Sequence, residues 1–230
     1  MTVHARQLVT RAPRLLLVEL LGLPLAALLV LAGALSAFTT LAEDYVTGDP
    51  IVRLDDRLAN GLHSHAAEPF TSMMRAVTEL GGGILLAILT VAAYALLARR
   101  GQRPLGAFVA AAFLGAELLT AALKLGFQRD RPVFEEPLAS AGAYSFPSGH
   151  ALVSVVVYGA LAFVLATRLR SPRARVACFL VAAVLALAIG FSRLYLGLHY
   201  LSDVLAGFSA GTAWLLGCIA TFRFWAQRRE

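Results

Sequence analysis

The chain has 230 residues, of which 59% are hydrophobic and only 15% are charged. Because soluble domains carry roughly 25% charged residues, this composition excludes an ordinary water-soluble domain and indicates that the protein folds in lipid. The formal net charge of +6 would suit a nucleic-acid partner. However, the basic residues are distributed as in a membrane protein, so we expect no nucleic-acid partner.

Six apolar runs are long enough, or nearly so, to cross a hydrocarbon core of about 30 Å. In chain order they are Leu15–Phe38, Gly81–Leu97, Leu105–Leu125, Ala151–Thr167, Val176–Leu196 and Leu201–Phe222. Within lipid the backbone must satisfy its own hydrogen bonds, so each run is predicted to be a helix. The expected fold is all-α: a single domain, residues 1–230, forming a polytopic bundle of six transmembrane helices.

Basic residues are concentrated before, between and after alternate runs. Thirteen of the twenty basic residues follow this pattern, namely Arg6, Arg11, Arg14, Arg99, Arg100, Arg103, Arg168, Arg170, Arg173, Arg175, Arg223, Arg228 and Arg229. The other loops carry the acidic residues Glu43, Asp44, Asp49, Asp55, Asp56, Glu68, Glu79, Asp130, Glu135 and Glu136. The positive-inside rule therefore predicts cytoplasmic termini and external odd-numbered loops, in the plasma (inner) membrane.

A cleavable signal peptide is the alternative interpretation of the first run. Its segment Ala34-Leu35-Ser36-Ala37 resembles a cleavage site. The run exceeds twenty residues, however, against about 7–15 for the apolar part of a signal peptide. Removing it would also disturb the alternation of the arginines, so we expect this helix to be retained.

Three connections between the runs are predicted to be external. Thr39–Leu80 contains the turn signal Gly48-Asp49-Pro50 and then Ile51–Leu62, which is predicted to form a short helix at the membrane interface. Gly126–Pro147 is rich in charged, proline and aromatic residues, whereas the connection around Gly197–Tyr200 is very short.

Three polar clusters fall at the predicted external ends of the helices. They are Lys124-x6-Arg131-Pro132, Pro147-Ser148-Gly149-His150 and Ser192-Arg193-x5-His199-x3-Asp203. Cationic and titratable side chains at one membrane depth are costly to place there, so their coincidence indicates a functional site.

The cationic residues of these clusters suit phosphate. Lys124, Arg131 and Arg193 supply three positive charges, and arginine adds a planar fork of donors. At the start of the fourth helix, Ser148 and Gly149 are expected to direct unpaired backbone N–H groups at the same anion, assisted by the helix dipole. These five residues are the predicted phosphate-binding residues.

The two histidines and the aspartate supply reactive groups. His199 and Asp203 are four residues apart and share one face of a continuous helix. The carboxylate can hold one ring nitrogen as a donor and leave the other as a nucleophile, while His150 can protonate a leaving oxygen. A single histidine at a membrane interface more often packs than reacts, so the joint pattern carries the prediction that His199, His150 and Asp203 are catalytic.

Together the clusters resemble the signature motifs of the type 2 phosphatidic acid phosphatase superfamily, the lipid phosphate phosphatases. That family carries Lys-x6-Arg-Pro, Pro-Ser-Gly-His and Ser-Arg-x5-His-x3-Asp, and every defined position is matched here in the same order. The resemblance covers roughly residues 70–222 and agrees with a six-helix topology.

The resemblance implies a role for each matched residue. His199 would form a phosphohistidine, Asp203 would orient it, and His150 would act first as an acid and then as the base for the hydrolytic water. The five predicted phosphate-binding residues would hold the phosphate. Members of this family need no metal or other cofactor, and no carboxylate cluster in the sequence looks able to hold Mg²⁺.

Glu117 and the histidines of the first external loop carry weaker signals. Glu117 lies two turns from Lys124 and is expected to pair within the bundle. His63 and His65, near Glu68, could bind a metal, but the ligand count falls short and a solvated loop is expected. Cys178 and Cys218 lie in apolar runs and are expected to be small packed side chains rather than a disulfide or zinc site.

The residues that flank the motifs are open to two interpretations each. Arg129 and Asp130 adjoin the first motif and are candidates for contact with a lipid head group. Tyr144 and Phe146 precede the second motif and are candidates either for lining the lipid's path to the site or for anchoring the interface.

The predicted substrate is a membrane lipid that carries its phosphate at head-group height. Undecaprenyl diphosphate, cleaved to the monophosphate, is preferred because recycled carrier lipid emerges on the outer leaflet; phosphatidic acid and phosphatidylglycerol phosphate are the alternatives. A phospholipid transporter or flippase is the alternative of another class, but binding alone does not require a paired His–Asp and a second histidine. The sequence therefore favours a metal-independent phosphatase of unknown oligomeric state.

Overall fold

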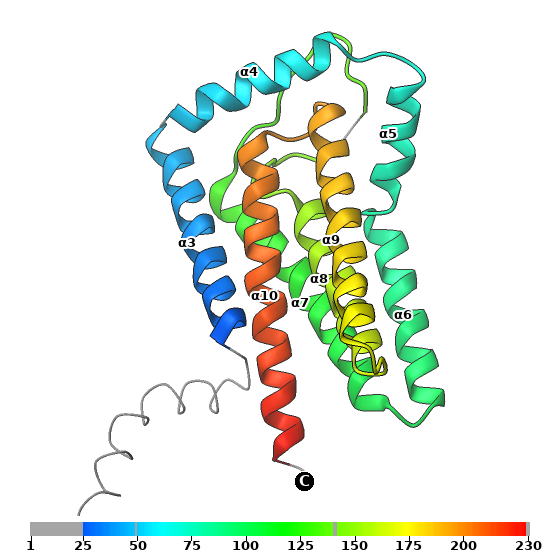
Figure 1. Ribbon diagram of the computed structural model, residues 1–230. Coiled ribbons are helices and arrows are strands. Elements are labelled where there is room, and N and C mark those ends of the chain that lie inside the picture. Colours follow the sequence, from blue (N-terminus) through cyan, green and yellow to red (C-terminus); the bar gives the residue numbers. More distant parts are fainter. Residues whose placement is uncertain (1–24, 49, 140–141, 229–230) are drawn as a thin grey trace, which may run out of the picture.

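The computed structural model describes residues 25–48, 50–139 and 142–228, and all regular structure in these ranges is helical (Figure 1). The helices are α3 (Leu25–Thr47), α4 (Pro50–Ser64), α5 (Phe70–Glu79), α6 (Gly83–Arg99), α7 (Arg103–Phe127), α8 (Gly149–Ala166), α9 (Pro172–Tyr195) and α10 (Leu201–Gln227). The predicted all-α class is confirmed for the described residues.

Helix α8 forms the centre of the bundle and packs against α6, α7, α9 and α10. Most of its residues are buried, as expected for a helix that is apolar on every face. The surrounding helices instead expose large apolar side chains, such as Ile84 on α6, Leu118 on α7 and Val184 on α9. An apolar exterior of this kind is stable in lipid and not in water, so the chain is a multi-pass membrane protein.

Five helices, α3, α7, α8, α9 and α10, are long and apolar enough to cross a membrane. Helix α6 has 17 residues, a length of about 26 Å at 1.5 Å per residue. It is joined to α5 by a short break with a bend of 42°, and the two helices together would make a sixth span. From the second run onward the helices lie close to the predicted runs, whereas the count of six spans stays a prediction.

The first predicted run is covered only from Leu25 onward, and Arg6, Arg11, Arg14 and Arg229 also lie outside the described residues. Helix α3 continues past Phe38 to Thr47, so the predicted end of this run is wrong. The reason is tertiary packing: Leu41 is buried, and the Tyr45 ring stacks on Phe146 with 5.7 Å between centroids. These contacts stabilise helix where the composition is already polar.

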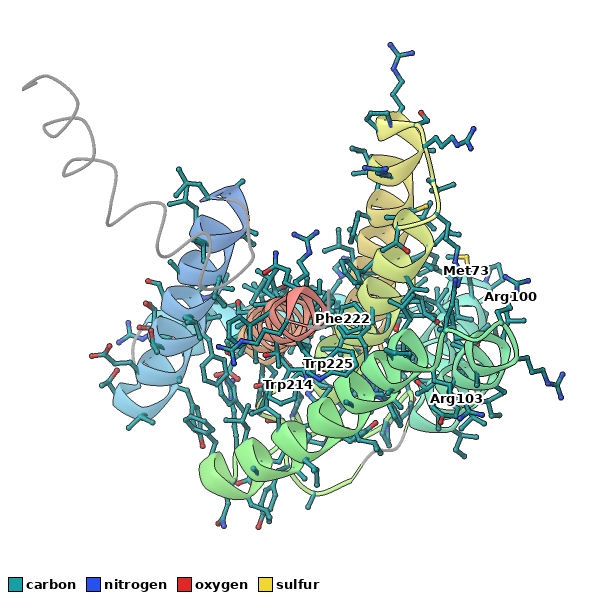
Figure 2. The ribbon with its side chains drawn as sticks, turned by 90° about the horizontal axis from the view of Figure 1, so that it is seen from below. Met73, Arg100, Arg103, Trp214, Phe222 and Trp225 are labelled. Atoms are coloured by element: carbon teal, nitrogen blue, oxygen red, sulfur yellow. The ribbon has the colours of Figure 1, made fainter. Side chains whose placement is uncertain are left out.

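The two ends of the bundle carry different segments (Figure 1). Helix α4, which contains the short helix predicted at Ile51–Leu62, lies across one end and connects α3 to α5, near the α9–α10 connection. The α6–α7 turn and the end of α10 lie at the opposite end, and Figure 2 views that end, with Arg100 and Arg103 labelled on the turn. The basic turns are thus separated from α4, as the predicted topology requires.

Helix α10 approaches α8 closely through two glycines, one turn apart. A Cβ atom at Gly207 would lie 2.6 Å from the Ser148 carbonyl oxygen, and one at Gly211 would lie 2.6 Å from the Leu152 carbonyl oxygen. Farther along α10, Trp214 turns toward α7 (Figure 2) and donates from Nε1 to the Ala112 carbonyl at 2.9 Å. These contacts set the position of α10 and therefore of Asp203 at its first turn.

Replacing Gly207 with alanine is expected to destabilise the protein by about 1–3 kcal/mol, because the added methyl group meets backbone that cannot move aside. The measurement is the midpoint of thermal unfolding in detergent. Gly217→Ala on the same helix is the matched control, since a Cβ atom at that position would meet nothing within 4 Å beyond the adjacent backbone of its own helix; that variant should match or exceed the wild type. Equal midpoints for the two variants would contradict the close approach.

Candidate active site

A cavity of about 620 Å³ opens where α6, α7, α8 and α9 meet the α7–α8 loop and the α9–α10 connection. Six of the eight predicted site residues lie on its wall: Lys124, Arg131, Gly149, His150, Arg193 and His199. Asp203 and Ser148 are fully buried behind that wall. Three separated stretches of chain therefore converge on one positively charged pocket.

His199 lies in the tight connection between α9 and α10. Gly197 adopts a φ of +68° there, a left-handed conformation that favours glycine, and this turns the chain sharply into α10. The His199 Nδ1 atom lies 3.3 Å from Asp203 Oδ2, which also accepts from the Tyr200 backbone N–H at 2.9 Å. Asp203 thus acts both as part of the N-terminal cap of α10 and as the hydrogen-bond partner of the ring.

The partners of His199 on both sides define its tautomer. Asp203 is an acceptor, so Nδ1 carries the proton, and Arg131 Nη1 donates to Nε2 at 3.1 Å. The lone pair on Nε2 is therefore held by Arg131, and both residues line the cavity. Burial lowers the pKa of His199 to about 3, against the opposing hydrogen bond and charge of Asp203, and the cations Arg131 and Arg193 lower it further. The ring is neutral at pH 7, the form that a nucleophile needs.

Carbonyl groups of the α7–α8 and α9–α10 connections hold Arg131 and Lys124. Arg131 donates from Nη2 to the Tyr144 carbonyl at 2.8 Å and from Nη1 to the Leu198 carbonyl at 2.5 Å. Lys124 Nζ donates to the Tyr144 carbonyl at 2.6 Å and to the Ser145 carbonyl at 3.3 Å. The α7–α8 loop thus places both cations at the cavity, and the Tyr144 carbonyl oxygen accepts a hydrogen bond from each of them.

Arg193 is buried near the end of α9, and helix α5 orients it. Its Nη1 donates to the Thr78 hydroxyl at 2.9 Å, whereas its Nε–H has no hydrogen-bond partner among the described residues. A buried guanidinium N–H without a partner is costly. An oxyanion bound in the cavity would satisfy it.

The start of α8 contributes Gly149 and His150 to the cavity. The prediction that Ser148 also offers an unpaired N–H is wrong, because this N–H donates to the Asp203 carbonyl at 2.9 Å. That hydrogen bond joins the second and third motifs directly. The Ser148 hydroxyl is buried and has no partner among the described residues, so a role for Ser148 in phosphate binding stays a prediction.

A group of charged residues behind the cavity was not predicted. Arg129 is 4% exposed and forms ion pairs with Asp203 at 2.7 Å and with Asp55 of α4 at 2.9 Å. The predicted contact of Arg129 with a lipid head group is therefore wrong, because the side chain points away from solvent. Its place two residues before Arg131 was the only signal in the sequence.

Neither predicted role of Phe146 is correct, since this ring is fully buried among Phe38, Tyr45 and Phe127. Tyr144 contributes its carbonyl to the site, as described above. His63 stacks on Phe134 with 3.9 Å between ring centroids, which is a packing role. Across the described residues, no group of three or more His, Cys, Asp or Glu side chains could hold a metal ion.

Glu117 lies on the wall of a second cavity of about 350 Å³, together with Lys124 and His150. The expected partner of Glu117 within the bundle is not found among the described residues. The first two turns of α6 contribute Ile84, Leu85 and Ile88 to the wall of the main cavity. The cavity is therefore lined by the cationic side chains of Lys124, Arg131 and Arg193 and, along α6, by these apolar side chains, which form its apolar side wall.

Two curated proteins are similar to part of this chain. A phosphatidylglycerophosphatase B of Bacillus subtilis (strain 168) is 40% identical over 95 residues, which cover 41% of this chain and 46% of that protein. YbjG of Escherichia coli (strain K12), which carries the provisional name undecaprenyl-diphosphatase, is 37% identical over 103 residues, covering 43% and 46%. The matched region thus spans just under half of the length of these curated relatives.

Two solved structures share the fold. The first is a crystal structure of a transmembrane PAP2-type phosphatidylglycerolphosphate phosphatase from Bacillus subtilis, with a TM-score of 0.74, 27% identity, and coverage of 87% of this chain and 97% of that one. The second, LpxE of Aquifex aeolicus, has a TM-score of 0.55 and 22% identity over 73% of this chain and 94% of that one, and shows the fold alone. Residues 105–227, more than half of the chain, match the PAP2 superfamily. The chain therefore belongs to the PAP2 superfamily.

Proposed function

We propose that this protein is a membrane lipid phosphatase that acts through a phosphohistidine at His199. The observation that carries the proposal is the cavity itself, in which the His199 imidazole, paired with Asp203, lies among three cationic side chains, with a second histidine on the same wall. A site that only bound phosphate would need the cations but not the oriented His199–Asp203 pair.

The first chemical step transfers the phosphoryl group to the enzyme. Nε2 of His199 attacks phosphorus, the N–P bond forms, and the bond between phosphorus and the leaving oxygen of the lipid breaks. In the structure Arg131 donates a hydrogen bond to Nε2. The oxygens of the bound phosphate therefore have to accept this hydrogen bond in place of Nε2 before Nε2 can attack. Arg193, Lys124 and Arg131 then stabilise the charge on the equatorial oxygens.

His150 handles the protons in both steps. His150 enters the first step protonated, with its positive charge stabilised by the bound phosphate, and donates this proton to the leaving oxygen. In the second step it accepts a proton from the hydrolytic water and is protonated again. Water then attacks the phosphorus, the N–P bond breaks, and inorganic phosphate leaves while Nε2 regains its lone pair. No metal takes part in this scheme, since the three cations neutralise the phosphate.

The topology proposed with this function follows the arginine distribution. Both termini lie in the cytoplasm, six helices cross the plasma (inner) membrane, and the cavity faces the extracytoplasmic side. Support comes from the separation of the α6–α7 turn, which carries Arg100 and Arg103, from the end of the bundle that α4 covers (Figure 1).

Phosphatidylglycerol phosphate and undecaprenyl diphosphate are the two substrates to test first. A curated relative and the solved structure with the higher TM-score are named for the former activity, and YbjG is provisionally named for the latter. Undecaprenyl diphosphate is the substrate preferred from the sequence, and phosphatidic acid is the third candidate. All three lipids offer the site the same phosphate chemistry. The cavity contacts described above recognise the phosphate and not the tail.

Purified protein in detergent is expected to release phosphate from at least one of these three lipids, with or without EDTA, and to be inhibited by vanadate, which imitates five-coordinate phosphorus. The measurement is inorganic phosphate release for each lipid. Loss of activity on chelation would show that a metal takes part. Binding of all three lipids without any release would instead favour a phospholipid transporter or flippase.

A further inference from the structure

A buried chain of polar contacts joins helix α4 to His199 from the side away from the cavity. Asp203 Oδ2 faces His199 Nδ1, while Asp203 Oδ1 accepts from Arg129 Nη1 at 2.7 Å. The other terminal nitrogen of the guanidinium, Nη2, donates to Asp55 Oδ2 at 2.9 Å. The Ser202 hydroxyl accepts from Arg129 Nη1 at 2.6 Å and donates to Asp55.

The two terminal nitrogens of the Arg129 guanidinium thus bind two different carboxylates. A guanidinium and a single carboxylate frequently form two parallel hydrogen bonds instead. Here Asp55, which is 0% exposed, holds Nη2, and its own Oδ1 is fixed by the Ser202 backbone N–H at 2.9 Å. The rings of Tyr45 and Tyr200 lie 4.9 and 4.2 Å from the guanidinium carbon and restrict it further.

We infer that Asp55 is a positioning residue for the nucleophile: by holding one arm of Arg129, it leaves one oxygen of Asp203 for His199. Without Asp55, Arg129 can rotate and bind both oxygens of Asp203. The imidazole then loses its acceptor at Nδ1, and the tautomer with its proton on Nε2, which cannot attack phosphorus, becomes populated.

This inference rests on the proposed function and assigns a role to α4. Asp55 lies outside residues 105–227, the part of the chain that matches the family. Other charged or titratable groups act on the His199 ring from several elements: Lys124 on α7, Arg131 in the α7–α8 loop, His150 on α8 and Arg193 on α9. They lie on the cavity side, so Asp55 and Arg129 are the groups that bear on Asp203 from behind.

The first test is Asp55→Asn, which keeps the shape of the side chain and an oxygen for the Ser202 N–H but cannot neutralise Arg129. Phosphate release should fall about 10–100-fold in kcat, with little change in KM, because the phosphate-binding cations are untouched. Asp55→Glu restores the charge and should recover part of kcat. Asp56→Asn, an exposed carboxylate on the same helix, is the matched control and should retain the wild-type kcat.

The second test separates this role from general support of the fold. Adding Arg129→Gln to Asp55→Asn removes the guanidinium that captures Asp203, so the double variant should be faster than Asp55→Asn alone. If Asp55 only stabilised the fold, a second buried substitution would make the enzyme slower still. A double variant slower than Asp55→Asn would therefore overturn the inference.

The third test does not depend on turnover. The measurement is NMR of the protein labelled with ¹⁵N-histidine. The chain has five histidines, and the signal of His199 is identified as the one that is lost in His199→Gln. The wild type should show the tautomer with its proton on Nδ1, and Asp55→Asn should show a mixture. An unchanged tautomer in Asp55→Asn would overturn the inference even if kcat fell. A wild type without phosphatase activity but with the expected tautomers would overturn the proposed function, while the control of the His199 tautomer by Asp55 would still hold.

Discussion

Replacing His199 with glutamine is expected to lower phosphate release by at least about 10³-fold, because the nucleophile is lost and water would have to attack directly. Glutamine keeps a polar side chain of similar length that can still face Asp203. The buried contacts around Asp203 should therefore persist, and the protein should elute as the wild type does from size exclusion in detergent.

The covalent intermediate gives the same prediction a direct readout. Wild-type enzyme quenched in base during turnover should carry phosphate on the peptide that contains His199, because phosphohistidine survives base and is hydrolysed in acid. His65→Gln, which changes an exposed histidine between α4 and α5, is the control and should keep full activity. Retained turnover in His199→Gln would exclude the mechanism.

Replacing His150 with alanine is expected to slow hydrolysis of an alkyl lipid phosphate about 10²–10⁴-fold, the usual contribution of a general acid. The loss should depend on the leaving group. With p-nitrophenyl phosphate, whose phenolate leaves without a proton, the first step should be nearly unaffected. The second step still needs a base, so nitrophenolate should appear as a rapid burst of one equivalent per enzyme, followed by slow turnover.

The burst distinguishes His150 from a residue that merely binds phosphate. A binding role would lower the rate equally for the alkyl and the aryl substrate and would give no burst. His199→Gln provides the matched comparison, since it should abolish release from both substrates and show no burst at all. An equal loss for both substrates in His150→Ala would therefore remove the acid–base role.

The sequence predicted the residues that touch the cavity better than those that support it. Lys124, Arg131, Arg193 and His199 are polar side chains at the ends of apolar helices, where burial is costly enough to require a reason. Their separation along the chain matched a known pattern, so their convergence could be predicted. The same reasoning predicted the helices from α6 onward, because an apolar run in lipid has no alternative to helix.

The supporting residues were hidden because their roles depend on long-range contacts. Arg129 lies in a loop rich in charged residues, where a solvated arginine is the ordinary expectation, and its partner Asp55 is 74 residues away. Asp55 is followed by the exposed Asp56, and nothing local distinguishes the two. Only the fold shows that one of these neighbours faces Arg129 and the other faces solvent.

The apolar positions were hard to interpret for a related reason. In a membrane protein both the interior and the exterior are apolar, so hydrophobicity does not reveal which side of a helix is packed. Phe146 was therefore expected either to line the lipid's path or to anchor the interface, although it is fully buried. Likewise, the first apolar run was ended at Phe38, although aromatic contacts extend α3 to Thr47. Shape complementarity, which a single sequence does not display, decides these positions.

The apolar side wall of the cavity determines how a substrate reaches His199. Ile84 and Ile88 on α6 are 82% and 58% exposed while they also line the cavity. In the proposed topology these side chains face acyl chains, so a lipid can slide its phosphate inward without its tail ever meeting water. Encounter is then a two-dimensional search within one leaflet, and its rate follows the mole fraction of the substrate among the surrounding lipids rather than its amount per unit volume.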